Sequence, residues 1–482
     1  MASQTQNIFR RYRWKEFGLF IIPFMILLLA MIQLPLAQYY ETQLNTNKQP
    51  VPFTLAVLPS VHALIPILGL IAVLLFVNML FSFFFPKADQ ILLPLVGLMS
   101  GIGVLMATRL GPDVGDPNLG ARQLLWVLIG LLMGIGVLFG LRNMNWLRRY
   151  KYTWAALGII LVGLTLGNAL RVKNFNSPTH DQLNFGPLNL QPSELLKICI
   201  AIFFAAYLSE NLDVIAESNL LLGPFRLPPF GEIGPFRLPP LRQLGPLALM
   251  LAISLVLFLG IRELGLALLI YGIFLAMLYL GSGKLSYVIV SLLMFFVLGF
   301  IGYKLFAYVQ DRFAAVSIDA VNWQNWSGDT IAFAKAQAYQ IMQGLIALSS
   351  GGIIGTGLGL GHAGNFVPIV QSDMIFTGIG EELGLAGLFA IIGIYLLIIY
   401  RGYRIAIESS DEFNQLLAAG LTSIFAIQAL IIIAGNMKFL PLTGIPLPFL
   451  SYGGSSIIAN YIIVGILLRI SHNTAREREG TI

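Results

Sequence analysis

Residues 285–306 read LSYVIVSLLMFFVLGFIGYKLF, an apolar run whose single charged residue is Lys304. As an α-helix, a run of this length crosses the hydrocarbon layer of a bilayer, which is about 30 Å thick. Similar runs recur along all 482 residues, of which 57% are hydrophobic and only 11% are charged. No soluble core absorbs so much apolar sequence, so we predict an all-α, polytopic membrane protein.

Runs of this kind predict about twelve transmembrane helices. Their approximate ranges are 17–36, 62–85, 91–108, 122–141, 152–170, 194–209, 244–260, 262–281, 285–306, 375–400, 414–436 and 454–470. The first run is too long for the apolar segment of a signal peptide and has no clear small-residue cleavage site. We therefore expect it to remain as a span.

The composition excludes several classes of protein. The net charge of +6 comes from Lys and Arg residues at the ends of apolar runs, which is typical of membrane topology rather than of nucleic-acid binding. The single cysteine, Cys199, excludes a disulfide within the chain and a cysteine-based zinc site. The four histidines show no metal-ligand spacing, so no metal site is predicted.

The positions of Lys and Arg predict that both termini are cytoplasmic. With the N-terminus inside, 18 of the 29 Lys and Arg residues fall in inside segments and 10 in outside segments, which leaves Lys197 in the membrane. The long segment 307–374 then lies outside, and a connection of that length is usually functional. The loop 210–243 lies inside and carries the sequence GPFRLPP twice, at 223–229 and 234–240. We interpret this repeat as a passive spacer, with a docking segment as the alternative.

Ionisable residues at membrane depth are costly and are therefore candidates for function. The run QPSELLK at 191–197 opens a span, and its Glu194 and Lys197 lie three residues apart on one helix face. An ion pair between them would lower the cost of burying both. The pair is either a structural salt bridge at the start of a helix or part of a site.

Two outside segments offer further candidates. The run SSGGIIGTGLGLG at 349–361 lacks the Gly-Lys-Ser/Thr of a P-loop, so its amides hold a lipid pyrophosphate or the run simply packs tightly. The segment PIVQSDMIF at 368–376 places Asp373 at the outer membrane boundary, where partial desolvation would raise its pKa towards that of a general base. On local sequence alone, an N-cap is the alternative role for Asp373.

Seven pieces, taken in order, resemble the SEDS family of membrane glycosyltransferases, to which the RodA, FtsW and SpoVE proteins belong. The resemblance runs from about residue 91 to 470. It is carried by Arg122-Gln123, the run 191–197, Tyr339-Gln340, the Ser-Gly-Gly run from Ser350, Asp373 to Phe376, Glu381 to Gly384, and Pro441 to Ser455. Each piece is weak by itself, but seven in this order are specific.

The resemblance implies a domain organisation and a reaction. Residues 1–90 would form a cytoplasmic tail and two extra spans, residues 91–470 a ten-span catalytic core, and residues 471–482 a cytoplasmic tail. The implied activity is polymerisation of lipid II, an undecaprenyl-pyrophosphate-linked disaccharide peptide, at the outer face of the bacterial cytoplasmic membrane. The implied partner is a class B penicillin-binding protein, which is a transpeptidase. A divalent cation that assists the pyrophosphate remains an open alternative.

The resemblance also implies site residues. The family's proposed catalytic aspartate falls on Asp373, which would act as the general base. The family's important Glu and Lys fall on Glu194 and Lys197. The predicted substrate-binding residues are Glu194, Lys197, Arg262, Glu263, Gln340, Ser350, Gly351, Gly352, Ser451 and Ser455.

Two departures from the family pattern leave rival interpretations open. The family's Gln-Pro-Asp-Leu-Gly reads Ile-Arg-Glu-Leu-Gly at 261–265, and its Arg-Trp or Ser-Trp pair is absent near Asp181 and Gln182. These departures make a cell-division scaffold without activity one rival. The other is a flippase for lipid-linked oligosaccharides, which would also need a membrane cavity with a few charges. The sequence does not distinguish roles in elongation, division and sporulation.

The repeat supplies a first test. Deleting residues 223–240 should leave polymerisation of lipid II intact, because a long cytoplasmic loop tolerates a change of length at modest entropic cost and lies far from an outer-face reaction. Glycan synthesis by purified wild-type and deleted proteins measures this. Loss of synthesis would show that the repeat supports the fold or holds a required partner.

Overall fold

The computed structural model describes residues 12–45, 61–172, 183–185, 188–217 and 241–480. Within these ranges the regular structure is helical apart from one antiparallel hairpin, in which β1 (Leu183–Phe185) pairs with β2 (Leu188–Leu190). The repeat at 223–240 and the positions 181–182 lie outside the described residues.

Each predicted span corresponds to a helix. These helices are α2 (Trp14–Asn45), α3 (Val61–Phe84), α4 (Leu92–Leu110), α5 (Leu119–Gly140), α7 (Lys151–Val172), α8 (Ser193–Glu217), α9 (Leu241–Gly260), α10 (Leu264–Ser282), α11 (Leu285–Leu305), α16 (Ile375–Glu408), α17 (Glu412–Asn436) and α18 (Gly454–Arg478). In the described residues, ten helices are long and apolar enough to cross a membrane, and α7 and α9 contain shorter apolar stretches. The all-α, polytopic fold is therefore confirmed.

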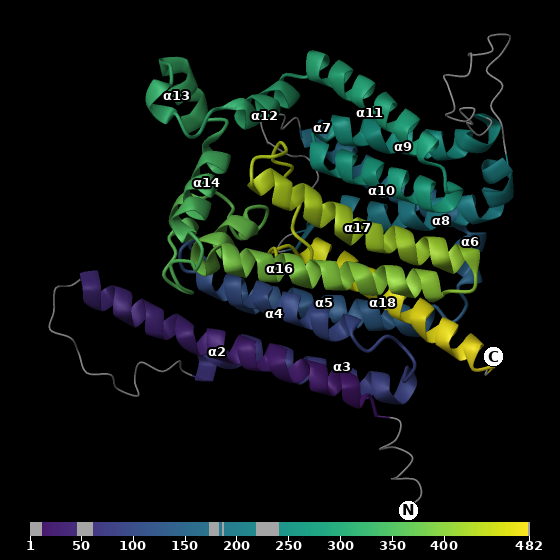
Figure 1. Cartoon of the computed structure of the whole chain (residues 1–482), viewed down its shortest axis with the longest axis horizontal. Coiled ribbons are helices and arrows are strands. Elements are labelled where there is room, and N and C mark those ends of the chain that lie inside the picture. The colour runs from purple at the N-terminus through teal and green to yellow at the C-terminus, as the bar shows by residue number, and fades with distance from the viewer. Residues whose placement is uncertain (1–11, 46–60, 173–182, 186–187, 218–240, 481–482) are drawn as a thin grey trace, which may run out of the picture. The chain divides into compact units, whose positions relative to one another are not determined.

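The outer segment predicted at 307–374 consists largely of short helices. They are α12 (Ala307–Ser317), the 3₁₀ helix η2 (Trp323–Asn325), α13 (Gly328–Lys335), α14 (Tyr339–Gly351) and α15 (Ala363–Phe366). One further short helix, α6 (Asn145–Arg149), lies on the predicted inner side. Figure 1 shows α12, α13 and α14 following one another along the chain after α11.

The helices form two compact units. One comprises Met1–Leu141, Arg312–Ile405 and Gln428–Ile482, and the other comprises Arg142–Asp311 and Ala406–Ile427. The first unit holds Asp373 and the glycine-rich run, and the second holds the candidate residues of α8 and of the turn before α10. In the second unit α7, α9 and α10 pack around α8, whose side chains from Leu196 to Ser209 are all buried.

In the first unit α5 and α18 approach each other very closely. A Cβ atom on Gly134 would lie 2.6 Å from the Tyr461 carbonyl oxygen, and one on Gly465 would lie 2.4 Å from the Gly134 carbonyl oxygen. Small residues permit such contact between helices in a membrane, where apolar burial alone gives little driving force. The Tyr461 hydroxyl is satisfied by Ser100 of α4 at 2.7 Å. These contacts fix α18 and the end of the irregular segment 437–453 that precedes it.

Single cysteines test the predicted orientation. Ile354, in the outer segment, is 85% exposed, and Tyr150, on the predicted inner side, is 44% exposed. In a Cys199→Ser background, Ile354→Cys should react with an impermeant thiol reagent on intact cells. Tyr150→Cys should react only after permeabilisation, because the Lys/Arg bias places it inside. The reverse labelling pattern would overturn the orientation.

Candidate functional site

Asp373 lies two residues before the start of α16, and only 9% of its surface is exposed. The Nε2 amide of Gln340, on α14, donates to the two carboxylate oxygens at 3.2 and 3.3 Å and to the Pro368 carbonyl at 3.2 Å. The structure therefore brings together two predicted site residues that are far apart in sequence. Because the amide is neutral, it orients the carboxylate without cancelling its charge.

Ser451, another predicted site residue, fixes the backbone beside Asp373. Its hydroxyl donates to the Ser372 carbonyl at 2.5 Å, and its own carbonyl accepts from the Gln123 side chain at 3.2 Å. Gln123 is fully buried on α5. A chain of bonds thus runs from α5 through the segment 437–453 to the residue before Asp373.

Two further bonds hold the same backbone. The Asn436 side chain, at the end of α17, donates to the Asp373 carbonyl at 2.8 Å. The Tyr452 amide donates to the Gln371 carbonyl at 2.7 Å. The position of the Asp373 carboxylate is therefore set by groups from α14, α17 and the segment 437–453.

The surroundings of Asp373 favour a carboxylate that can accept a proton near neutral pH. Burial raises the pKa of the Asp373 carboxyl to about 6, although backbone amides, the Gln340 side chain and the Arg312 charge lower it. Arg312, on α12, is itself held by a 2.8 Å bond to the Leu442 carbonyl. Desolvation therefore outweighs the stabilising groups, as the sequence analysis anticipated for this position.

The glycine-rich run packs against a break in α16. At Gly384 the backbone has φ 64° and ψ −168°, which interrupts the helix and frees backbone groups on both sides. Such groups need protein partners at membrane depth, where water is absent. Four bonds supply them: Thr356 N to Glu381 O (2.9 Å), Gly357 N to Glu382 O (3.0 Å), Leu385 N to Gly352 O (3.0 Å) and Ala386 N to Ile353 O (3.1 Å).

This packing favours one of the two interpretations of the run. Besides the amides of Thr356 and Gly357, those of Gly355, Gly359 and Leu360 also donate to protein oxygens. An anion would have to compete with each of these bonds. The arrangement therefore favours tight packing over a cradle for pyrophosphate.

The predicted residues Ser350, Gly351 and Gly352 lie at the junction between α14 and this run. The Ser350 hydroxyl donates to the Ala347 carbonyl at 2.8 Å. A Cβ atom on Gly351 would lie 2.0 Å from the Gly380 carbonyl oxygen, so only glycine fits there. The Gly352 carbonyl accepts from the Leu385 amide of α16. These contacts hold the three residues between α14 and α16. Their binding of substrate stays a prediction.

Arg109, the basic residue in the last turn of α4, was not among the predicted site residues. Its Nε atom lies 2.9 Å from Glu382, and its guanidinium also bonds Asp113 at 2.7 Å and the Gly361 carbonyl at 2.5 Å. Arg109 and Glu382 are both buried. Each lowers the cost of burying the other, provided that both keep their hydrogen bonds. An arginine at the end of an apolar span, together with a downstream Glu-Glu pair, was the available signal.

Glu381 holds the other end of the same segment. Its carboxylate accepts from the amides of His362 and Ala363 at 3.0 and 2.6 Å, at the start of α15. Backbone amides at a helix start stabilise a negative charge. Both glutamates therefore connect the outer segment to α16, and Glu382 is already paired with a cation.

In the second unit, Glu194 and Lys197 form the predicted ion pair. Nζ of Lys197 lies 2.6 Å from a carboxylate oxygen of Glu194, and both side chains are at most 2% exposed. Pro192 precedes them and accepts the first helical bonds of α8 from Leu195 and Leu196 at 3.1 Å. The geometry of the pair agrees with the sequence analysis, and its role in the reaction stays a prediction.

The departure from the family pattern at 261–265 involves the backbone conformation as well as the side chains. Arg262 has φ 62°, and its guanidinium lies 6.0 Å from the ring centroid of Tyr308. A proline is held near φ −65°, so the family's proline could not adopt this turn. Glu263 is buried at the start of α10. A substrate role for Arg262 and Glu263 is not tested by these contacts.

Two remaining predictions concern Ser455 and metal ions. Ser455 lies in the first turn of α18, and it too stays a candidate. Within the part of the chain that the structure describes, no three His, Cys, Asp or Glu side chains are grouped so that they could hold a metal ion.

The FtsW, RodA and SpoVE family, described as cell cycle proteins, matches residues 88–476. This chain belongs to that family. RodA of Mycobacterium tuberculosis, a peptidoglycan glycosyltransferase, is 36% identical over 402 residues, which cover 82% of this chain and 80% of that protein. FtsW of Geobacter metallireducens, a probable peptidoglycan glycosyltransferase, is 32% identical over 290 residues, which cover 60% of this chain and 68% of that protein.

Solved structures share the fold of this family. A peptidoglycan synthase complex that coordinates polymerization and crosslinking has a chain with TM-score 0.59 and 20% identity, covering 80% of this chain and 98% of that one. RodA of Thermus thermophilus has TM-score 0.53 and 20% identity, covering 80% of this chain and 97% of that one. Together with the apolar spans, family membership makes this chain a multi-pass protein of the bacterial inner membrane.

Variants of the buried Glu194–Lys197 ion pair test whether the pair stabilises the fold or takes part in the reaction. Lys197→Met leaves Glu194 buried without its cation, a change that typically costs about 3–5 kcal/mol, whereas Glu194→Gln with Lys197→Met leaves no buried charge. We expect the single variant to unfold in detergent at a lower temperature than the double variant. A single variant that is as stable as wild type but inactive would assign the pair to substrate binding or catalysis.

Proposed function

We propose that this chain polymerises lipid II into glycan strands at the outer face of the bacterial inner membrane. Peptidoglycan glycosyltransferase is the activity named for its RodA relatives. The observation that carries the proposal is a buried carboxylate, Asp373, oriented by a neutral amide and with a pKa raised to about 6. Such a group is mostly ionised at pH 7 and still basic enough to take a proton.

In the proposed reaction, Asp373 accepts the proton of the 4-hydroxyl of the acceptor sugar. The hydroxyl oxygen forms a bond to the anomeric carbon of the donor, and the bond between that carbon and the pyrophosphate oxygen breaks. Polyprenyl pyrophosphate leaves with the bonding electrons. Removing the hydroxyl proton in the transition state is what a positioned base contributes to such a step.

The fixed position of Asp373 supports this role. Gln340 orients the carboxylate, and Ser451 and Asn436 hold the backbone on either side of it. A base must remain within hydrogen-bond reach of the proton that it accepts, and displacement by about 1 Å can cost about 100-fold in rate. A carboxylate serving only as a helix cap would not need a partner on a separate helix.

A transpeptidase is the partner that suits this activity. Glycan strands must be crosslinked after synthesis, and the solved peptidoglycan synthase complex coordinates both steps. We propose a class B penicillin-binding protein as the partner. Co-purification of that protein from membranes tests this step independently of catalysis.

The rival functions make different use of Asp373. A flippase moves its substrate without breaking a bond and gains nothing from a base in an outer segment. A scaffold without activity would not need to keep a carboxylate desolvated, which is costly unless the group has a purpose. Both rivals predict that an amide in place of this carboxylate has little effect.

Asp373→Asn provides the decisive test. The amide keeps the size of the side chain and cannot accept the proton, so kcat for lipid II polymerisation should fall by a factor on the order of 10²–10⁴. Wild-type kcat/KM should fall about tenfold per pH unit below about pH 6, because the raised pKa of Asp373 leaves the base of the free enzyme protonated there. The residual rate of the variant should lack this dependence. Purified proteins and purified lipid II provide the measurement.

Asp329→Asn is a matched control, because Asp329 is an exposed aspartate in the same outer segment. Its rate and pH profile should equal those of wild type. Near-normal polymerisation by a well-folded Asp373→Asn protein would remove Asp373 as the base. Lipid II binding should persist in that variant, since the change removes a negative charge near an anionic substrate.

A further inference from the structure

Helices α2 and α3 precede the family-matched segment, which begins at residue 88. They belong to the first unit, and α2 packs along α4 and against α3. The side of α2 that faces the unit is buried at Leu27, Leu34 and Ala37. These two helices, which precede the family-matched segment, thus belong to the same unit as Asp373.

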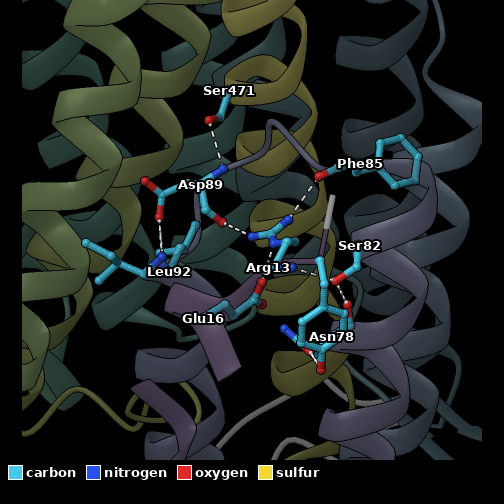
Figure 2. A network of polar contacts seen from close by, with 10 residues as sticks. Arg13, Glu16, Asn78, Ser82, Phe85, Asp89, Leu92 and Ser471 are labelled. Carbon is cyan, nitrogen blue, oxygen red and sulfur yellow. Dashed lines mark hydrogen bonds and ion pairs between the residues drawn. The ribbon is translucent and has the colours of Figure 1, made fainter. Parts of the chain in front are cut away.

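The N-terminal end of α2 is fixed by a buried polar network, shown in Figure 2. Arg13, 1% exposed, forms an ion pair with Glu16 and donates to the carbonyls of Phe85 at 3.0 Å and Asp89 at 2.5 Å. The Arg13 amide donates to the Ser82 hydroxyl at 3.2 Å. Removing such a buried charge from its partners is costly, so this end of α2 is held firmly in place.

Asp89 extends the network to α16. Its carboxylate accepts from the amides of Ile91 and Leu92 at 2.9 and 2.8 Å, at the start of α4, and forms an ion pair with Arg401. Arg401 lies on α16 beyond the break at Gly384. The anchor of α2 is therefore connected to the C-terminal part of that broken helix.

Further along α2, a second contact leads to the other part of α16. A Cβ atom on Gly359 would lie 2.9 Å from Cβ of Ala37 and 3.3 Å from the Leu34 side chain. The Gly359 amide donates to the Glu382 carboxylate at 2.9 Å. Glu382 precedes the break at Gly384, so α2 is connected to α16 on both sides of the break.

We propose that α2 is a built-in positioning element that holds the glycine-rich run, and through it the two parts of broken α16, in the arrangement that the reaction at Asp373 requires. Leu34 and Ala37 are its positioning residues, and they act through Gly359 and Glu382. The expected effect of α2 on kcat rests on the proposed function. Its expected effect on the position of the glycine-rich run does not.

The chain offers a matched pair of variants. Leu27 and Leu34 lie seven residues apart on one face of α2, and both are buried. Leu27 packs on Gly101 of α4, whereas Leu34 packs on Gly359. Both truncations to alanine remove the same atoms from the same helix, so a difference between them reports the contact with the glycine-rich run.

Two measurements are made on the purified full-length protein. With lipid II as substrate, Leu34→Ala should lower kcat by about 10- to 100-fold with KM within about twofold of wild type, because misplacement of the reacting groups affects the chemical step. Leu27→Ala should retain turnover close to that of wild type. Hydrogen exchange of the amides in residues 352–362 should be at least about tenfold faster in Leu34→Ala than in Leu27→Ala.

Leu34→Met, which keeps the volume of the side chain, should restore both readouts. Leu34→Val serves as the milder variant if Leu34→Ala does not fold. Equal turnover and equal exchange in the Leu27 and Leu34 variants would overturn the proposal. If wild-type protein makes no glycan, the proposed function fails, and the exchange measurement still decides whether α2 holds the run.

Discussion

The break in α16 at Gly384 is the constraint on which the rest of the first unit depends. A helix that spans a membrane satisfies its own backbone, and a break in it exposes carbonyl and amide groups that lipid cannot satisfy. Here the run 352–357 supplies all four partners through its own backbone. Because the run must approach α16 within hydrogen-bond distance, Gly351 and Gly355 have no room for a Cβ atom. These glycines thus allow the run to reach the backbone groups that the break in α16 leaves without helical partners.

Two kinds of buried carboxylate precede this break. Glu382 is paired with Arg109 and bonded to a backbone amide, and Glu381 is bonded to two amides, so their charges are compensated and their positions fixed. Asp373 instead keeps a neutral partner, Gln340, and desolvation raises its pKa. The two glutamates thus hold the outer segment against α16, whereas the side-chain partner of Asp373 carries no charge.

Hydropathy alone predicted the twelve long helices, because the length of an apolar run is a local property of the sequence. The Glu194–Lys197 pair was also predictable, since a helix brings residues three apart together. The bond between Gln340 and Asp373 was not, because it joins two outer segments whose folding depends on tertiary contacts. Hydropathy also gave no sign that α2 contacts Gly359, because a lipid-facing and a protein-facing leucine look alike in sequence.

The pieces that carry the family resemblance were weak one by one, and the structure shows why they occur together. Gln123 bonds the Ser451 carbonyl, Ser451 bonds the Ser372 carbonyl, and Gln340 bonds the Asp373 carboxylate. Replacing any one of them would leave a partner unsatisfied or a carboxylate free to turn. The departure at 261–265 lies in the other unit, and none of its residues is a partner in these bonds. The side chains that support the proposed base are therefore separate from those at which the chain departs from the family pattern.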